Sequence, residues 1–401
     1  MVWFDFVLCI LALIPASAGV YVAVLSIAGI AGGPLKRPRR SSPLTIAVVV
    51  PAHNEALNIQ TTVRSLLGVD YPDLSRQVWV LADNCSDDTA FRARDAGAHV
   101  IERTNTERRG KGHALSDTFP TLLQDPSIGC VVVVDADTTV SPNLLWQISD
   151  HLQAGAQVVQ ARYGVANPDS SWRTRLLHIA LSAFHDVRSL GRERLGLSCG
   201  LRGNGMGFSR GALESVPHRS MAIVEDAEYG IRLAMADIRV TYMHDAVVLG
   251  DMPADAKSSG VQRNRWEGGR IALRRMYLGP LLRDAATRRS RVSADMALDL
   301  LVPPLGQLVV RLTALTLGIG WLGFIIDHRF ISAEVAAAGL VGIGIHVIEG
   351  WRRSGTGLRG LADLACAPAY IAWKLVGIRG GSRPPKEWVR TPRAGETNLK
   401  P

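Results

Sequence analysis

Two carboxylates separated by one small residue, Asp135-Ala136-Asp137, form the strongest chemical signal in the sequence. They directly follow the apolar run Val131–Val134, which predicts that they lie at the end of a buried strand. Carboxylate pairs without histidine or thiolate favour hard cations such as Mg²⁺ or Mn²⁺, and these cations also bridge phosphate oxygens. An isolated pair of this kind is often a solvated turn. Its position after a valine strand favours a metal site at Asp135 and Asp137.

A phosphorylated ligand would need cations near that metal. The segment Arg108–His113 combines basic residues with glycines. One interpretation is an exposed basic loop. The other, which we favour, is a flexible clamp in which Arg109 and Lys111 neutralise a diphosphate. Asp83 follows another apolar run and is able to accept hydrogen bonds from a base or a ribose.

Two further acids, Glu225 and Asp226, begin a predicted helix. The positive end of the helix dipole explains one of them, and the other could be a general base. Upstream, Gly203–Phe208 is rich in glycine, which permits the backbone to approach a ligand. That segment lacks the spacing of a dinucleotide fingerprint.

The segment Gln262-Arg263-Asn264-Arg265-Trp266 is predicted to be helical. A helix places its first, fourth and fifth residues on one face. A membrane-surface helix with snorkelling arginines is the alternative interpretation.

These residues require a scaffold, and residues 41–295 predict alternating strands and helices. Strands alternating with helices indicate an α/β fold with a mostly parallel sheet and helices on both faces. Ligands in such sheets bind beyond the carboxyl ends of the strands, where the candidate residues stand. The apolar runs predicted as strands are Thr45–Val50, Val78–Ala82, Ala98–Ile101, Val131–Val134 and Val158–Tyr163.

Capping residues predict where three of the helices begin. Asn54, followed by Glu55, is a candidate helix cap after the first strand. Ser86-Asp87-Asp88 opens a helix that Gly97 ends. Ser141 is a candidate cap, with Pro142 in the first turn.

The formal net charge is +9, and the basic residues crowd beside apolar stretches. That distribution indicates anchoring on the cytoplasmic side of a membrane, and no nucleic-acid-binding module is recognisable. The five cysteines have no metal-ligand spacing, which argues against a disulfide framework or a zinc site.

Four apolar stretches predict membrane segments. The first, up to residue 33, carries only the charge of Asp5, lacks a basic start and continues past Ala18, so we expect an uncleaved anchor. Leu300–Ile326 and Ile331–Ile348 are predicted to span, and Leu361–Ile378 to be interfacial or re-entrant, although an even number of spans stays open. The predicted segments are an anchor at 1–33, a basic linker at 34–43, a cytoplasmic catalytic domain at 44–280, a linker or interfacial segment at 281–297, a membrane region at 298–378 and a basic cytoplasmic tail at 379–401.

Taken in order, the motifs over about residues 44–280 resemble glycosyltransferase family 2, the inverting, nucleotide-sugar-dependent enzymes with the GT-A fold. No single motif is decisive, but their combined order is specific. The motifs are Pro51-Ala52-His53-Asn54-Glu55, Ala82-Asp83-Asn84, Arg109-Gly110-Lys111-Gly112, Asp135-Ala136-Asp137, Glu225-Asp226 and Gln262-Arg263-Asn264-Arg265-Trp266.

The resemblance implies a role for each matching position. Asp226 would be the general base, Asp83 would contact the nucleoside, and Asp135 and Asp137 would serve ribose and a Mg²⁺ or Mn²⁺ ion. Val224 stands where relatives often have Thr. The implied nucleotide-sugar-binding residues are Pro51, Ala52, Asn54, Glu55, Asp83, Arg109, Lys111, Asp135, Ala136, Gln262, Arg265 and Trp266. The implied acceptor-binding residues are Gly203, Asn204, Gly205, Glu225 and Trp266.

The expected activity is transfer of a hexosyl or N-acetylhexosaminyl group from a UDP- or GDP-linked donor to a lipid-linked or polysaccharide acceptor. The expected location is the cytoplasmic face of a bacterial inner membrane. A processive polysaccharide synthase is the alternative within the family. A membrane nucleotidyltransferase, which would release pyrophosphate, and a non-catalytic membrane scaffold are alternatives from other classes. The sequence leaves the sugar, the nucleotide base and the acceptor open.

Overall fold

The computed structural model describes residues 2–32, 35, 42–219, 222, 224–252 and 256–368. The described chain divides into two compact units. A sheet unit contains the described parts of residues 35–174 and 197–296, and a helical unit contains residues 2–32, 175–196 and 297–368. The predicted linker at 34–43 and the predicted tail at 379–401 lie largely or entirely outside the described residues.

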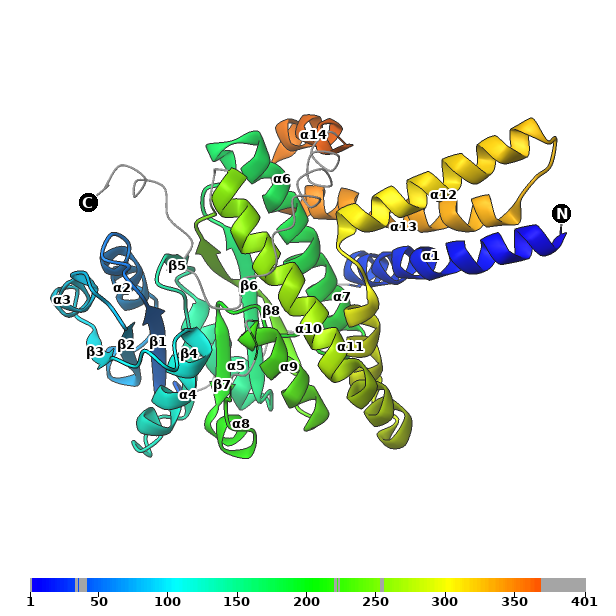
Figure 1. Cartoon of the computed structure of the whole chain (residues 1–401). Helices are drawn as coiled ribbons and strands as arrows, with labels where there is room; N and C mark the ends of the chain where they lie inside the picture. Colours follow the sequence, from blue (N-terminus) through cyan, green and yellow to red (C-terminus); the bar gives the residue numbers. More distant parts are fainter. Residues whose placement is uncertain are drawn as a thin grey trace. The chain divides into compact units, whose positions relative to one another are not determined.

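The sheet unit is built on one eight-stranded sheet with the order β3-β2-β1-β4-β7-β6-β8-β5 (Figure 1). Strands β3, β2, β1 and β4 are mutually parallel, β7 is antiparallel to both of its neighbours, and β8 is parallel to β6 but antiparallel to β5. The strands are β1 Ile46–Ala52, β2 Arg76–Asp83, β3 His99–Arg103, β4 Cys130–Val133, β5 Thr138–Val140, β6 Val158–Val165, β7 Met206–Ser209 and β8 Val240–Gly250.

The α/β prediction is confirmed, and all five predicted strands are present. The sheet is mixed because three strands that the sequence did not predict, β5, β7 and β8, add antiparallel pairings. Strand β7 lies in the glycine-rich segment, and glycine is depleted in strands. Gly207 is required there, because a Cβ at this position would lie 2.7 Å from Val159 Cγ2 on the neighbouring strand.

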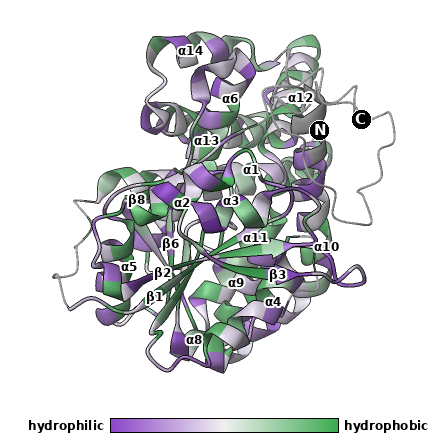
Figure 2. Ribbon diagram, turned by 90° about the vertical axis from the view of Figure 1, so that its left-hand side faces the viewer, coloured by the Kyte–Doolittle hydropathy of each residue, from purple (hydrophilic) through white to green (hydrophobic). Residues whose placement is uncertain are grey.

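Helices pack on both faces of the sheet. Alternate residues of β1, such as Val48 and Val50, enter a core shared with α2, α3 and α5. On the other face, the ring of Phe119 from α4 contacts Phe208 of β7, which in turn contacts Tyr229 of α9. Figure 2 shows the hydrophobic colouring of the central strands and the mixed colouring of the surrounding helices.

The helices begin and end as follows. The sheet unit holds α2 Ile59–Leu67, α3 Thr89–Asp95, α4 Lys111–Leu122, α5 Leu144–Gln153, α8 Arg210–Ser215, α9 Glu225–Met235 and α10 Ala256–Arg288. The helical unit holds α1 Val2–Ala31, α7 Arg188–Arg194, α12 Leu305–Ile325, α13 Ile331–Ser354 and α14 Gly357–Ala365. Helices α6 Trp172–Leu181 and α11 Arg291–Leu301 each begin in one unit and end in the other. The described residues also contain short helical turns at Asp73–Ser75, Pro168–Ser170 and Ser182–Val187.

Two predicted helix caps are wrong. Asn54 adopts the left-handed conformation and is not a cap, since α2 begins later and has Asn58 at its cap position. Ser141 is also not the cap of α5, because Asn143 occupies that position. The Ser141 hydroxyl donates to Asn143 Oδ1 and accepts from the Val247 N–H, so it connects the helix start to β8.

Within the helical unit, α1, α12 and α13 are long and apolar enough to cross a membrane (Figure 1). Small residues let α1 and α13 approach closely, because a Cβ at Gly19 would lie 2.3 Å from the Gly339 carbonyl oxygen. The predicted span at Leu300 starts too early. Pro303 and Pro304 separate α11 from α12, which begins at Leu305.

Residues 281–297, predicted as a linker or interfacial segment, are almost entirely helical, since α10 continues to Arg288 and α11 begins at Arg291. Only the first part of the predicted interfacial segment Leu361–Ile378 is described, and it contains the end of α14. Residues 369–378 lie outside the described chain.

Candidate active site

The carboxyl ends of β2, β1 and β4 lie next to one another because these strands are parallel neighbours. Ala52 pairs with Ala82, and Val49 pairs with Val133. The loops after these strands therefore emerge at one edge of the sheet and carry three of the predicted motifs. Pro51 and Ala52 themselves belong to the end of β1.

Two asparagines shape the loops after β1 and β2. Asn54 and Asn84 both have positive φ angles, of 55° and 52°, which asparagine tolerates better than most residues. The Asn54 Oδ1 accepts a hydrogen bond of 2.8 Å from the Ser86 N–H, which joins the two loops. Glu55 follows, is buried, and its N–H donates to Thr89 Oγ1. The first motif therefore fixes the backbone at this edge.

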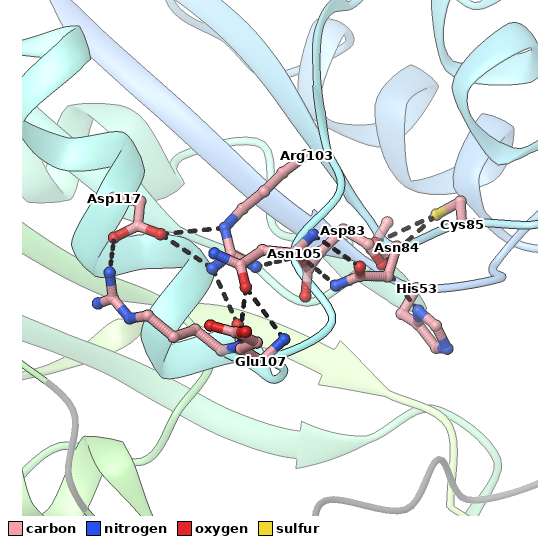
Figure 3. Close-up of polar contacts among 10 residues, drawn as sticks. His53, Asp83, Asn84, Cys85, Arg103, Asn105, Glu107 and Asp117 are labelled. Carbon is pink, nitrogen blue, oxygen red and sulfur yellow. Dashed lines mark hydrogen bonds and ion pairs between the residues drawn. The ribbon is translucent and has the colours of Figure 1, made fainter.

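Asp83 is the last residue of β2, and its carboxylate is held by neighbouring side chains (Figure 3). The Arg103 Nη1 donates to Asp83 Oδ1 over 2.6 Å, and the Asn84 Nδ2 donates to the same oxygen over 2.9 Å. The His53 Nδ1 lies 2.7 Å from the Asp83 carbonyl oxygen. The predicted nucleoside contact thus stands in a fixed orientation.

The Asn204 side chain forms hydrogen bonds at both ends of the turn Asp135–Asp137. Its Oδ1 accepts from the Asp135 N–H at 3.1 Å, and its Nδ2 donates to Thr138 Oγ1 at 2.8 Å. Asn204 is fully buried. We therefore expect this predicted acceptor-binding residue to act by positioning the two carboxylates. The Thr62 hydroxyl adds a bond of 2.8 Å to the Ala136 carbonyl oxygen.

Lys111 lies at the centre of the site. As the first residue of α4, it pairs its Nζ with Asp135 Oδ1 at 2.5 Å and also donates to the Gly203 carbonyl oxygen. Burial acts to lower the pKa of Lys111, but the combined effect of Asp135, Glu225 and Asp226 is larger, so the pKa is raised above its usual value. Lys111 therefore stays charged and links the metal motif to the acidic pair.

Asp226 lies beside the same glycine. A Cβ at Gly203 would lie 3.2 Å from Asp226 Oδ2 and 3.8 Å from Lys111 Nζ, and the φ of +80° at Gly203 also favours glycine. Burial raises the pKa of Asp226, whereas its backbone hydrogen bond and the charges of Lys111 and Arg202 lower it. A carboxylate destabilised by burial is suited to accept a proton.

Glu225 supplies a test of this electrostatic arrangement. Burial, followed by the Asp226 charge, raises the pKa of Glu225 from 4.5 to about 7. The folded protein then holds the proton more tightly than the unfolded chain, so stability falls as the pH rises between these two values. We expect Glu225→Gln to raise the melting temperature at about pH 8 by at least about 2 °C, and by less at about pH 5.

The matched control for that measurement is Glu214→Gln, which changes an exposed glutamate. An equal shift of the melting temperature at both pH values would contradict the assigned ionisation of Glu225.

Helix α10 carries Gln262, Arg265 and Trp266, and the predicted helical spacing is confirmed. All three side chains are half-buried. The Arg265 charge lowers the pKa of Glu225, which indicates that the cation acts on the acidic pair. Among the other predicted site residues, Arg109 is exposed. Gly205 has no room for a side chain, because a Cβ there would lie 2.9 Å from the Val248 side chain.

A buried glutamate connects α9 to α10. Glu228 accepts from the Tyr277 hydroxyl at 2.8 Å and from the Ala222 N–H at 2.9 Å. We expect Tyr277→Phe to destabilise the protein by about 1–3 kcal/mol, because the buried carboxylate loses a donor. Thermal unfolding of the full chain in detergent checks this, with the exposed Arg275→Gln as control. No change relative to that control would contradict the assigned bond.

The metal prediction is tested by the chemistry of the donor set. Within the described residues, no group of three His, Cys, Asp or Glu side chains could hold a metal by itself. Mg²⁺, however, is commonly bound by one or two carboxylates together with substrate phosphates and water. Asp135 and Asp137, with oxygen ligands only, fit a metal that is completed by a diphosphate.

Three residues of the site were missed in the sequence. Arg103 holds Asp83, the Arg202 charge acts on Asp226, and Glu228 holds α10. Their partners lie on other elements, so local patterns do not mark them. Arg202 stands next to the glycine-rich segment, which was the only signal in its neighbourhood.

Comparison with known proteins shows which family this chain resembles. The model of a family described as "Glycosyltransferase like family 2" matches residues 43–269. Beta-monoglucosyldiacylglycerol synthase from Synechocystis sp. is 29% identical over 234 residues, which are 56% of this chain and 47% of that protein. The cellulose synthase catalytic subunit (UDP-forming) of Komagataeibacter sucrofermentans is 23% identical over 340 residues, covering 77% of this chain and 42% of that protein. The chain spans about half the length of the curated relatives it matches.

A solved structure supports the fold. The mannosyltransferase of Pyrobaculum calidifontis, in complex with GDP-Man and Mn²⁺, has a TM-score of 0.55 at 18% identity and covers 93% of this chain and 94% of its own. The fold is therefore of the GT-A type, with three candidate membrane helices among the described residues in addition.

Proposed function

Because this chain belongs to glycosyltransferase family 2, we propose that it is an inverting enzyme that moves a sugar from a nucleotide-sugar to a lipid-linked acceptor. The observation that carries the proposal is the meeting of Asp226, Lys111 and Asp135 beside Gly203 at the carboxyl edge of the sheet. A base, a cation and a metal-type carboxylate are the three groups that displacement of a nucleoside diphosphate requires.

In the proposed reaction, Asp226 takes the proton from the acceptor hydroxyl. The hydroxyl oxygen forms a bond to the anomeric carbon on the face opposite the diphosphate, and the bond between that carbon and the phosphate oxygen breaks. The electron pair leaves with the nucleoside diphosphate, and the configuration inverts. Lys111 and Arg265 stabilise the charge that develops on the leaving group. A divalent ion at Asp135 and Asp137 would supply further Lewis-acid stabilisation.

Two observations support a lipid-linked acceptor at a membrane. Helices α1, α12 and α13 are candidate spans, and a similar relative is named a glucosyldiacylglycerol synthase. Arg352 and Arg353 lie in the last turn of α13, and basic residues collect on the cytoplasmic side of membranes. We place the catalytic residues on that side, where nucleotide-sugars are made.

A processive polysaccharide synthase is the second candidate. It is favoured by the match to the cellulose synthase subunit, which extends over 340 residues. Three candidate spans among the described residues are few for a private product channel, so we prefer a single addition.

The test is to incubate the purified full chain, in lipid nanodiscs, with a panel of radiolabelled nucleotide-sugars and Mn²⁺ or Mg²⁺. Label should appear in the lipid extract, with release of a nucleoside diphosphate. Label found only in long polymer would favour the processive candidate. Release of pyrophosphate would indicate a nucleotidyltransferase, and absence of any transfer across the panel would contradict the proposal.

A further inference from the structure

Arg103, the last residue of β3, joins three segments around the predicted nucleoside contact (Figure 3). Its Nη1 donates to Asp83 Oδ1 at the end of β2, as described above. Its Nη2 donates to the Arg108 carbonyl oxygen at 2.8 Å and to Asp117 Oδ2 at 2.9 Å, and its Nε donates to the same Asp117 oxygen at 3.1 Å. The Arg103 and Asp83 side chains are only 10% and 9% exposed, so the bond between them is largely shielded from water.

Because of these bonds, the two oxygens of the Asp83 carboxylate are not equivalent. Oδ1 accepts from both Arg103 and Asn84. Within the described residues, Oδ2 accepts no hydrogen bond. A carboxylate oxygen has about two lone-pair positions, so Oδ1 is fully used and Oδ2 is the oxygen available to a ligand.

The orientation of this carboxylate is also fixed from its other neighbours. The Asn84 Oδ1 accepts from the Asn105 N–H at 2.9 Å, and the Asn84 N–H donates to the Arg103 carbonyl oxygen at 2.7 Å. Rotation of the carboxylate to present both oxygens would break two hydrogen bonds, one from the Arg103 guanidinium and one from the Asn84 amide, inside a partly buried network.

We propose that Arg103 is a positioning residue that leaves Asp83 with one open oxygen and thereby selects a uracil nucleotide over a guanine nucleotide as the sugar donor. The inference rests on the proposed function and on the predicted contact between Asp83 and the nucleoside.

The chemistry of the two bases explains the selection. Uracil presents a single N–H donor, at N3, between two carbonyl oxygens. Guanine presents two parallel donors, at N1 and N2, which are satisfied together by the two oxygens of one carboxylate, as in the two-pronged pairing of arginine. With Oδ1 occupied by Arg103, guanine would bury one donor without a partner, which is costly.

The same guanidinium connects base recognition to the basic loop. The bond to the Arg108 carbonyl oxygen holds the loop before α4, and the Asn105 Oδ1 accepts from the Arg108 N–H at 2.9 Å. The Asp117 side chain lies on α4, the helix that begins with Lys111. Loss of Arg103 is therefore expected to weaken uracil nucleotide binding as well as base selection.

The first measurement is calorimetric binding of UDP and of GDP to the full chain in the presence of Mn²⁺. We expect UDP to bind more tightly by about tenfold or more, the cost of one unpaired donor. Equal or tighter binding of GDP would overturn the inference while leaving the proposed transfer intact. Binding of neither nucleotide would overturn the proposed function and the inference together.

The second measurement uses Arg103→Gln, which should weaken UDP binding and reduce the preference for UDP over GDP to within about threefold. Arg94→Gln is the matched control, because Arg94 of α3 forms an exposed ion pair with Glu102, the neighbour of Arg103 on β3. Should Arg103→Gln melt at a much lower temperature than the control, Arg103→Lys gives the same test, with an intermediate preference expected. An unchanged ratio of UDP to GDP affinity in a folded variant contradicts the role of Arg103, because a purely structural residue would not alter that ratio.

Discussion

Asp226→Asn is expected to lower the rate of sugar transfer by about 10²–10⁴-fold while leaving donor binding within about threefold of wild type. Asparagine keeps the size of the side chain but does not accept a proton. Asp226 stands beside Gly203 and Lys111, so the substitution changes the base without opening the site. The measurement is single-turnover transfer of a labelled sugar, together with calorimetric binding of the donor.

The matched control is Asp237→Asn, which changes an exposed residue just after α9. Asparagine tolerates the positive φ angle of this position. Because burial raises the pKa of Asp226, the wild-type rate should also rise with pH as this carboxyl ionises. Retained turnover in Asp226→Asn, or a rate that falls as the carboxyl ionises, would remove Asp226 as the base.

Asp137→Asn is expected to remove the dependence of donor binding on divalent metal, with a loss of transfer of at least about 10²-fold. An amide oxygen is neutral and binds Mg²⁺ or Mn²⁺ more weakly than a carboxylate. The direct measurement is the ratio of UDP affinities with and without Mn²⁺, which is independent of turnover. Wild type should show a large ratio, and the variant a ratio near one.

The exposed Asp95→Asn serves as control, since it changes a carboxylate that accepts a bond from Gln60 on the surface of the sheet unit. A variant at Asp137 that keeps the wild-type ratio would place the metal elsewhere. Enhanced Mn²⁺ relaxation in the presence of UDP gives a second measure of the bound ion that does not depend on catalysis.

The parts of the fold that could be predicted from the sequence are those in which consecutive residues are apolar and buried. The parallel strands β1 and β4 are unbroken apolar runs, and both of their faces are buried. The antiparallel strand β7 was not predicted because glycine is uncommon in strands. Gly207 is present because the Val159 side chain on the neighbouring strand leaves no room for a Cβ, and this contact is not visible in the local sequence.

The candidate site follows the same division. Asp83, Asp135 and Asp226 stand at the ends or starts of predictable elements, so their types and positions were sufficient to select them. Arg103 was not selected, because its role depends on a hydrogen bond to Asp83, which lies twenty residues earlier in the sequence. Its isolated position in the sequence is that of an ordinary polar residue at a strand end.

The division of the chain into units could not be predicted either. Residues 175–196 interrupt the predicted catalytic domain at 44–280, yet they belong to the helical unit with α1 and α13. The reason is packing: a Cβ at Gly191 would lie 2.1 Å from the Leu25 carbonyl oxygen, and Arg192 donates to the Tyr21 hydroxyl. Such contacts join positions more than 150 residues apart.

The pairing of Lys111 with Asp135 means that the protein carries its own substitute cation. In the absence of donor, the ammonium group neutralises a carboxylate that would otherwise attract a free divalent ion. Ion and donor are then expected to enter together, because the diphosphate offers Lys111 a new partner and releases Asp135. Such an exchange would make the free protein a poor scavenger of cellular metal and would tie assembly of the reactive centre to arrival of the sugar.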